Sequence, residues 1–168
     1  MHEMEQVMNE HTRYLVRIAY LYVKNWSTAE DIVQEVFVTY FQKSDQFRKD
    51  ASLKTYLTKM TANRSKDYLR SWKHKKDMLL SAAFSSTKGA EDELLEQEQL
   101  ISLRKHLFQL PLKYREPLIL YYYDEQSIAE IASYLELNEN TVKTRLRRAK
   151  QQLKEFFEEE DEEVTSNE

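Results

Sequence analysis

Cysteine is absent from this chain of 168 residues, glycine occurs once and proline occurs twice. The lack of cysteine excludes disulfides and thiolate metal sites, and it fits a protein of the cytoplasm. A glycine-rich loop that cradles phosphate needs several glycines, so Gly89 alone does not build one. So few helix-interrupting residues predict a mostly helical protein.

Further absences narrow the functional classes. No apolar run is long enough to span a membrane, and the first residues, MHEMEQVMNEH, lack the basic-then-apolar order of a signal peptide. The four histidines form none of the spaced pairs that hold catalytic zinc, and no serine lies in a nucleophile elbow. We therefore expect a cytoplasmic protein with no catalytic residue, no metal, no cofactor and no small-molecule substrate.

The net charge of −4 conceals two basic segments. Lysine and arginine dominate residues 48–76 and residues 139–154, whereas acidic residues gather at 91–98 and from 155 onward. Two separate basic surfaces favour two contacts with a polyanion such as DNA. The acidic tail over 158–168 is expected to be disordered and solvated.

Apolar side chains at helical spacing predict three helices in the first half of the chain. The first is expected over about 9–24, the second after Ser27 or Thr28 as its N-cap, and the third from Ser52 after a loop. Residues 77–93 are rich in serine and threonine and lack periodicity, which is typical of a linker.

These features predict an all-α fold with two small helical domains joined by a flexible linker. Residues 1–76 would form the first domain, residues 77–93 the linker, and residues 94–157 a second domain that contains a helix-turn-helix.

The helix-turn-helix pattern lies between Gln126 and Leu153, where two short helices flank a polar turn at 136–138. Asn138 is the expected N-cap of the second helix, which begins at Glu139. One face of this second helix is apolar and the opposite face is basic, as in a recognition helix that enters the major groove of DNA. The apolar face contains Val142, Leu146, Ala149 and Leu153, and the polar face contains Lys143, Thr144, Arg147 and Arg148.

Several motifs in a fixed order carry a resemblance to a known family. They are AEDIVQEVF at 29–37, DQFRKDASLKTYLTKMTANRSKDYLR at 45–70, LPLKYREPLILYYYDEQSIAEIA at 110–132 and NTVKTRLRRA at 140–149. Together they resemble the bacterial RNA polymerase sigma factors of the extracytoplasmic-function (ECF) group of the sigma-70 family. The resemblance implies an alternative sigma factor that binds core RNA polymerase and directs it to promoters with specific −10 and −35 elements.

The resemblance also implies which residues meet the polymerase. The helix with the AEDIVQE motif would dock on the β′ clamp helices through Asp31, Gln34, Glu35 and Val38. An acidic face beside an apolar stripe suits a basic, amphipathic partner helix. Residues 110–123 would support the helix-turn-helix and touch the β flap. Members of the group are usually held inactive by an anti-sigma factor, often membrane-anchored, and one is expected here.

The loop before Ser52 and the helix after it resemble the element that reads the −10 region, where one base of the non-template strand is flipped out. Phe47 and Asn63 match the positions that hold this base, by stacking and by hydrogen bonding. Phe47 is equally compatible with a place in the core beneath the loop. The implied −10 residues are Phe47, Arg48, Lys49, Asp50, Ala51, Ser52, Lys59, Asn63, Arg64, Lys66 and Arg70.

For the −35 element, the resemblance implies base contacts from the polar face of the recognition helix and phosphate contacts from its flanks. The implied −35 residues are Thr141, Lys143, Thr144, Arg145, Arg147 and Arg148, with Thr141 and Arg145 at the phosphates. Glu136 stands where many helix-turn-helix turns have glycine, so the details of the turn are open.

Two other interpretations compete with a sigma factor. A stand-alone helix-turn-helix transcriptional regulator accounts for residues 126–153 but not for the basic residues 48–76, and it would bind duplex DNA tightly by itself as a dimer. A helical protein-interaction module leaves both basic segments unexplained and predicts no salt-dependent affinity for DNA.

Overall fold

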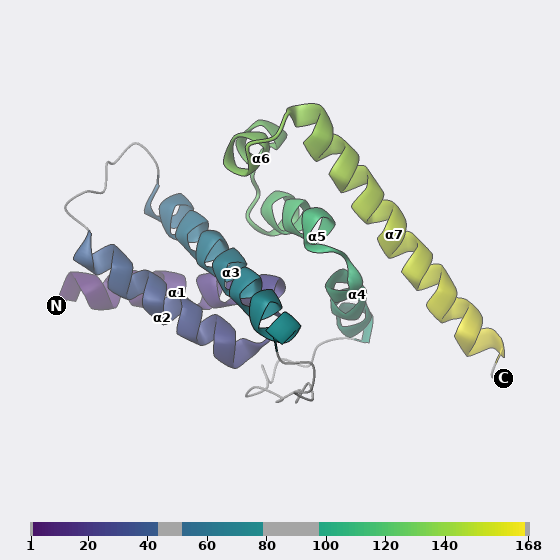
Figure 1. The fold of residues 1–168 in the computed structure, drawn as a ribbon, viewed down its shortest axis with the longest axis horizontal. Coiled ribbons are helices and arrows are strands. Elements are labelled where there is room, and N and C mark those ends of the chain that lie inside the picture. The colour runs from purple at the N-terminus through teal and green to yellow at the C-terminus, as the bar shows by residue number, and fades with distance from the viewer. Residues whose placement is uncertain (1, 44–51, 79–97, 167–168) are drawn as a thin grey trace. The chain divides into compact units, whose positions relative to one another are not determined.

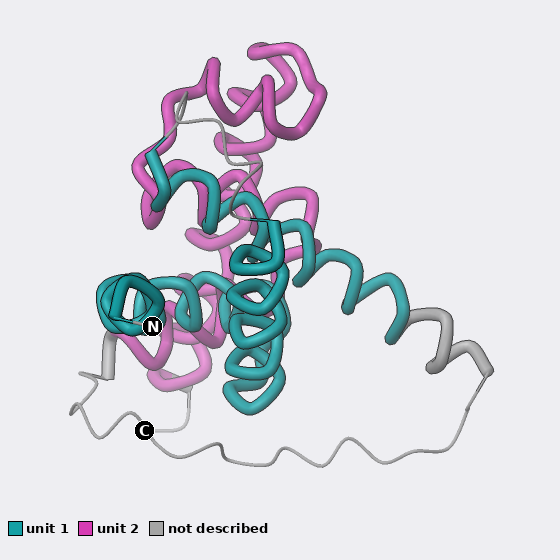
Figure 2. Tube along the Cα trace, turned by 90° about the vertical axis from the view of Figure 1, so that its left-hand side faces the viewer, with its two compact units in different colours: residues 1–91 teal, residues 92–168 magenta. Residues whose placement is uncertain are grey.

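The computed structural model describes residues 2–43, 52–78 and 98–166, and every element in these ranges is a helix (Figure 1). The chain divides into two compact units, residues 1–91 and residues 92–168 (Figure 2). The all-α prediction with two helical units is therefore confirmed. None of the described helices is long and apolar enough to cross a membrane.

Unit 1 is a bundle of three helices, α1 (His2–Val23), α2 (Trp26–Gln42) and α3 (Leu53–Met78), each of which contacts the other two. Its core is formed by side chains that repeat at helical spacing. Leu15, Ile18 and Tyr22 of α1 are fully buried, Ile32 and Val33 of α2 nearly so, and Leu57 of α3 fully. Burial of these apolar faces is the main force that holds the bundle together.

The ends of the helices in unit 1 differ in part from those expected. α1 begins at His2, ahead of the predicted start, and its first turns expose Met4 and Met8. Methionine and glutamate are good helix formers, so the helix extends ahead of its predicted start. α3 begins after Ser52 as predicted, and the Thr55 amide donates a hydrogen bond to the Ser52 hydroxyl over 3.2 Å.

The N-cap of α2 is Asn25, so the prediction of Ser27 or Thr28 was wrong. Asn25 is extended, with φ −141° and ψ 124°, and its side chain accepts a hydrogen bond from the Thr28 amide over 2.9 Å. Lys24 before it has a left-handed backbone, with φ 65°, which turns the chain between α1 and α2. The helix thus begins at Trp26, whose ring stacks on Tyr20 with centroids 4.0 Å apart.

Unit 2 contains α4 (Glu98–Gln109), α5 (Leu112–Leu118), a π-helical turn η2 (Ile119–Tyr123), α6 (Ile128–Leu135) and α7 (Glu139–Ser166). The helices α6, α5 and α4 lie in turn along the length of α7 (Figure 1). Leu110, Leu120, Ile131 and Val142 are buried at the centre of its core. The long helix α7 is therefore the support on which the rest of unit 2 packs.

A change of helical pitch follows Pro117, which lies inside α5. Proline has no amide hydrogen to donate to the carbonyl of Lys113, so its cost falls on the turn of α5 that precedes it. The chain continues as the wider η2, in which the Asp124 amide reaches the Ile119 carbonyl over 3.0 Å. This turn leads directly into the loop before α6.

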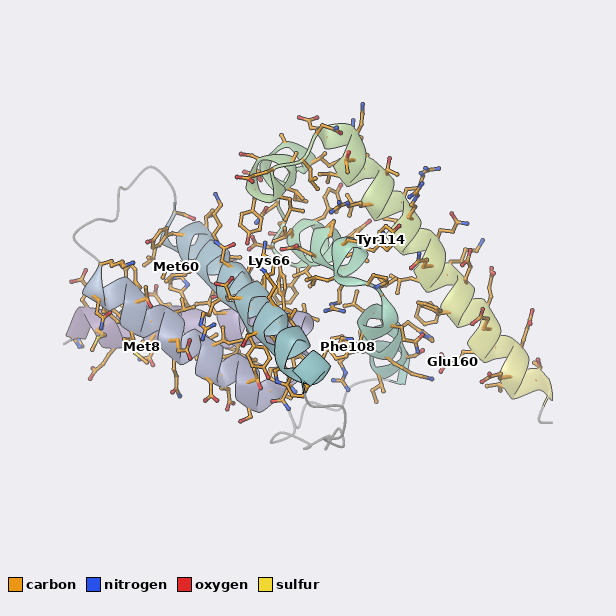
Figure 3. The ribbon with its side chains drawn as sticks, in the orientation of Figure 1. Met8, Met60, Lys66, Phe108, Tyr114 and Glu160 are labelled. Carbon is orange, nitrogen blue, oxygen red and sulfur yellow. The ribbon has the colours of Figure 1, made fainter. Side chains whose placement is uncertain are left out.

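The prediction of a disordered acidic tail over 158–168 was wrong for the part that the structure describes, because α7 continues through Ser166. Glu160 on α7 lies beside α4 (Figure 3) and accepts hydrogen bonds from Ser102 over 2.5 Å and from Lys105 over 3.4 Å. The His106 ring lies 2.9 Å from the same carboxylate and packs against Phe156 and Phe157.

The hydrogen bonds from Ser102 and His106 lower the pKa of the Glu160 carboxyl from 4.5 to about 2. Their favourable interactions with the charged form outweigh the loss of solvation, which alone would raise the pKa. The acidic composition of residues 158–168 gives no sign that one carboxylate, that of Glu160, anchors the end of α7 to α4.

The predicted boundaries of the two domains and of the linker that joins them stay predictions. α3 continues through Met78, which the predicted linker had included, and most of that linker lies outside the described residues.

Candidate nucleic-acid interface

The helix-turn-helix is formed by α6, a short turn and α7. Ser127 and Glu130 form a capping box at the start of α6, in which the Glu130 amide donates to the Ser127 hydroxyl over 3.1 Å and the Ser127 amide donates to the Glu130 carboxylate over 2.7 Å. Two backbone groups without helical partners are thereby satisfied. The start of the motif is thus fixed by side chains from its own sequence.

The turn adopts the geometry that glycine favours, although no glycine is present. Glu136 has a left-handed backbone with φ 55° and ψ 43°, and the Leu137 amide closes the turn on the Ala132 carbonyl over 2.9 Å. Asn138 then accepts hydrogen bonds from the Thr141 amide over 2.7 Å and the Thr141 hydroxyl over 2.9 Å. The predicted turn and the predicted N-cap of α7 are confirmed.

The first half of α7 has one buried face and one exposed basic face. Val142, Leu146 and Ala149 lie in the core of unit 2, and Leu153 packs against it. On the opposite side, Lys143, Arg147 and Arg148 are exposed, whereas Thr141, Thr144 and Arg145 are partly exposed. The apolar face fixes the helix to unit 2, so the cationic side chains are presented outward together.

A polar groove beside this face includes residues that sequence reasoning missed. It has a volume of about 440 Å³, and its lining is Lys113, Tyr114, Asn138, Asn140, Thr141, Thr144, Arg145 and Arg148. Lys113 and Tyr114 come from α5, which packs against α7. No periodicity in the sequence relates α5 to α7, so only the tertiary structure brings these side chains to the basic face.

Tyr114 lines the groove with 9% of its surface exposed, and Figure 3 shows it on α5. The Lys113 ammonium lies 4.9 Å from the centre of the Tyr114 ring, and the Arg148 side chain lines the same groove. The interaction with Arg148 and the positive charges of Lys113 and Arg148 lower the pKa of the Tyr114 hydroxyl, against the opposing effect of burial.

In unit 1, the exposed face of α2 contains all four residues predicted to meet the polymerase. Asp31, Gln34, Glu35 and Val38 are exposed, and Val38 retains 57% of its surface. The opposite face of α2 supplies Ile32, Val33, Val36 and Phe37 to the core. A single exposed valine is common on protein surfaces, so the role of this face in docking stays a prediction.

The residues of α3 that are predicted to contact the −10 element lie on two different sides of the helix. Lys59, Asn63, Lys66 and Arg70 recur at helical intervals, so they share one stripe along the helix. Arg64 lies on the flank towards α2, where it forms an ion pair with Glu35. The structure thus joins a predicted DNA contact to a predicted polymerase contact. Phe47, Arg48, Lys49, Asp50 and Ala51 lie outside the described residues.

No group of histidine and acidic residues that could hold a metal ion occurs in ranges 2–43, 52–78 and 98–166.

Each of the two units matches a family of known proteins. Residues 7–74 match the family described as Sigma-70 region 2, and residues 101–153 match the family described as Sigma-70, region 4. The chain is 31% identical to the ECF RNA polymerase sigma factor SigW of Bacillus subtilis, over 83% of this chain and 81% of SigW. It is 32% identical to the sigma factor SigV of the same organism, over 84% of this chain and 83% of SigV.

The chain belongs to the ECF sigma factors. It is therefore an alternative sigma factor, which binds core RNA polymerase and directs it to promoters. A stand-alone regulator or a protein-interaction module would not carry regions 2 and 4 in this order, so both alternatives are set aside.

The fold of this sigma factor also matches a solved structure. The sigma factor RpoE from Bartonella quintana, in complex with the anti-sigma factor NepR, superposes with a TM-score of 0.78 at 22% identity. The match covers 94% of this chain and 98% of RpoE. Region 4 as matched ends at residue 153, so the part of α7 that is anchored to α4 by Glu160 lies beyond it.

Proposed function

We propose that this sigma factor reads a −35 element with the first half of α7. Lys143, Thr144, Arg147 and Arg148 would contact base edges in the major groove, and Thr141 and Arg145 would contact phosphates. The observation that carries this proposal is the division of α7 into a buried apolar face and an exposed basic face directly after the helix-turn-helix turn.

In unit 1, the stripe of Lys59, Asn63, Lys66 and Arg70 on α3 would follow the −10 region. The exposed Asn63 amide has donors and an acceptor for the edge of a flipped base. The lysines and Arg70 would meet phosphates, which position the strand without reading it. Phe47 and the residues up to Ser52 would complete the pocket for this base.

Docking on the polymerase is assigned to Asp31, Gln34, Glu35 and Val38 on α2, against the β′ clamp helices. The acidic side chains would pair with basic residues of the partner, and Val38 would be buried at the contact. Residues 110–123 would meet the β flap. The protein would act in the cytoplasm and have no catalytic activity of its own.

An anti-sigma factor is also proposed as a partner. The supporting observation is that RpoE, which shares this fold, was solved with the anti-sigma factor NepR. An inhibitor that covers the α2 face or the α7 face would block the same surfaces that polymerase and promoter use.

The test is binding of the purified protein to bacterial core RNA polymerase, followed by transcription from a library with randomised −35 and −10 elements. We expect tight binding to the core enzyme and initiation at one shared pair of elements. The variant Val38→Asp should weaken binding to the core enzyme, and Arg147→Ala should change the −35 preference alone. Initiation without any preference at −35 would contradict the assignment to α7.

A further inference from the structure

An ion pair in unit 1 joins two helices that are assigned to different partners. The Arg64 Nε–H group on α3 donates a hydrogen bond to the Glu35 carboxylate on α2, and α2 and α3 pack against each other. Glu35 lies on the exposed α2 face that is proposed to meet the polymerase, whereas Arg64 is one of the residues predicted to contact the −10 element. A charge from each proposed interface is therefore occupied by a charge from the other.

The position of the pair allows both charges to change partner. The side chains of Arg64 and Glu35 are 42% and 52% exposed, so water screens their attraction and a stronger partner can displace either of them. A basic helix that meets Glu35 in an interface, or a phosphate that meets Arg64, is such a partner. While the carboxylate is bound to Arg64, however, it offsets the positive charge that attracts a DNA phosphate.

We propose that this ion pair is an autoinhibitory contact, which docking on the polymerase releases. When basic residues of the polymerase bind the Glu35 carboxylate, the Arg64 guanidinium is freed and binds a phosphate of the −10 strand. Contact of unit 1 with DNA thus depends on docking of α2. The proposal rests on the proposed roles of α2 in docking and of α3 at the −10 element.

The coupling acts in both directions, because the two binding free energies are linked. Loss of Arg64 frees Glu35 for the polymerase, just as docking frees Arg64 for DNA. An exposed ion pair supports an effect of about 1.4- to 5-fold in affinity. Arg64→Gln should therefore strengthen binding to core RNA polymerase by this factor, although it removes a predicted DNA contact. A side chain that only contacts DNA, or only supports the fold, gives no such gain.

The first test measures the affinity of the full-length protein for core RNA polymerase without DNA, at low ionic strength, where exposed charges are least screened. Wild type, Glu35→Gln, Arg64→Gln and the double variant form a cycle. The gain from Arg64→Gln should vanish in the Glu35→Gln background. Lys54→Gln is the matched control, because it removes a positive charge from α3 outside the predicted sites. Any effect of this control should be the same with and without Glu35.

The second test measures binding of the same four proteins to a single-stranded oligonucleotide of mixed sequence, without polymerase. Glu35→Gln should raise this affinity about 1.4- to 5-fold, and the gain should be absent when Arg64 is also replaced. Glu30→Gln removes a carboxylate of α2 outside the proposed docking residues, so its effect should not depend on Arg64. Lys59→Gln, which should weaken binding, shows that the strand lies on α3.

The outcomes separate the proposed contact from the proposed function. If Arg64→Gln does not strengthen binding to the core enzyme, or does so equally without Glu35, the autoinhibitory role is overturned. An oligonucleotide affinity that Glu35→Gln does not raise also overturns it. In these cases the docking role of α2 stands if Glu35→Gln weakens binding to the core enzyme. If neither Glu35→Gln nor Val38→Asp weakens that binding, or Lys59→Gln leaves DNA binding unchanged, the proposed function of unit 1 fails and the proposal falls with it.

Discussion

The N-cap of α7 connects the stability of the recognition helix to its function, and substitution of Asn138 tests that connection. The Asn138 carbonyl oxygen accepts hydrogen bonds from the Thr141 amide and hydroxyl. Asn138→Ala leaves that amide to water, because Asn138 is exposed and Thr141 partly exposed. The expected loss is therefore that of an ordinary N-cap, about 1 kcal/mol within a range of roughly 0.5–2 kcal/mol.

This loss of free energy should be visible in the melting temperature and in the rate of hydrogen exchange. For a unit of this size, a loss of about 1 kcal/mol lowers the melting temperature by roughly 4–8 °C. If the first turn of α7 opens by the same free energy, protection of the Val142 amide from hydrogen exchange falls about 5-fold, because its hydrogen bond to the Asn138 backbone carbonyl remains in the variant. Thermal melting and site-resolved hydrogen exchange measure the two effects independently.

Asn138→Asp is the matched variant, because it keeps an acceptor at the cap and adds a negative charge. The charge is favourable beside a helix N-terminus, so stability should be maintained or raised by about 0.3–1 kcal/mol. The same charge lies in the groove with Arg145 and Arg148 and would repel DNA phosphates, so affinity for the −35 element should fall. Asn138→Ala should weaken both properties, whereas Asn138→Asp should weaken only binding to DNA.

The reasoning would be refuted if Asn138→Ala left the melting temperature and the exchange of the Val142 amide unchanged. Equal loss of stability in both variants would show that the carboxamide acts through something other than its acceptor. Unchanged −35 affinity in Asn138→Asp would show that the groove does not face the phosphates.

Three further predictions concern other parts of the molecule. The carboxyl of Glu160 has a folded-state pKa of about 2, below its ordinary value of 4.5, so its contribution to stability is present above pH 4.5 and is lost as the pH falls towards 2. Glu160→Gln should remove this part of the acid dependence of the contact between α4 and α7, measured by hydrogen exchange in α4, whereas Glu159→Gln should not. Arg147→Ala should cost about 1–3 kcal/mol of promoter binding if Arg147 reads a base, with a loss that varies with the −35 sequence. A loss uniform across −35 variants would make Arg147 a phosphate contact. Asn63→Ala should shift the preference within the −10 element and leave the −35 preference intact, measured on the same promoter library, and an unchanged −10 preference would contradict the pocket assigned to Asn63.

The sequence best predicted those structural features that depend on the residues of a single helix. The two faces of α7 follow from the helical period, and Asn138 is the one side chain before Glu139 that is suited to cap it. At α2 the sequence offers Asn25, Ser27 and Thr28 within four residues, and the extended backbone of Asn25 decides among them. Local chemistry cannot make that choice, because all three are good N-caps.

Prediction failed where the deciding contact joins distant segments. A run of glutamates is typical of a solvated tail, yet one of them, Glu160, meets Ser102 and His106 on a helix that is far away in sequence. The place of Lys113 and Tyr114 in the groove beside α7 was missed for the same reason. Charge patterns describe a segment on its own and contain no information about its tertiary neighbours.

The ion pair between Glu35 and Arg64 changes how mutations in unit 1 must be interpreted. Glu35 was assigned to the polymerase and Arg64 to the DNA, but the structure pairs them across α2 and α3. Both side chains are about half exposed, at 52% and 42%, so their direct contribution to stability is small, about 0–1 kcal/mol. Removal of either charge frees the other for a new partner. A loss of transcription in a Glu35 variant can therefore arise partly from the altered surroundings of Arg64. The double variant of Glu35 and Arg64, compared with both single variants, separates the effect on docking from the effect on contact with DNA.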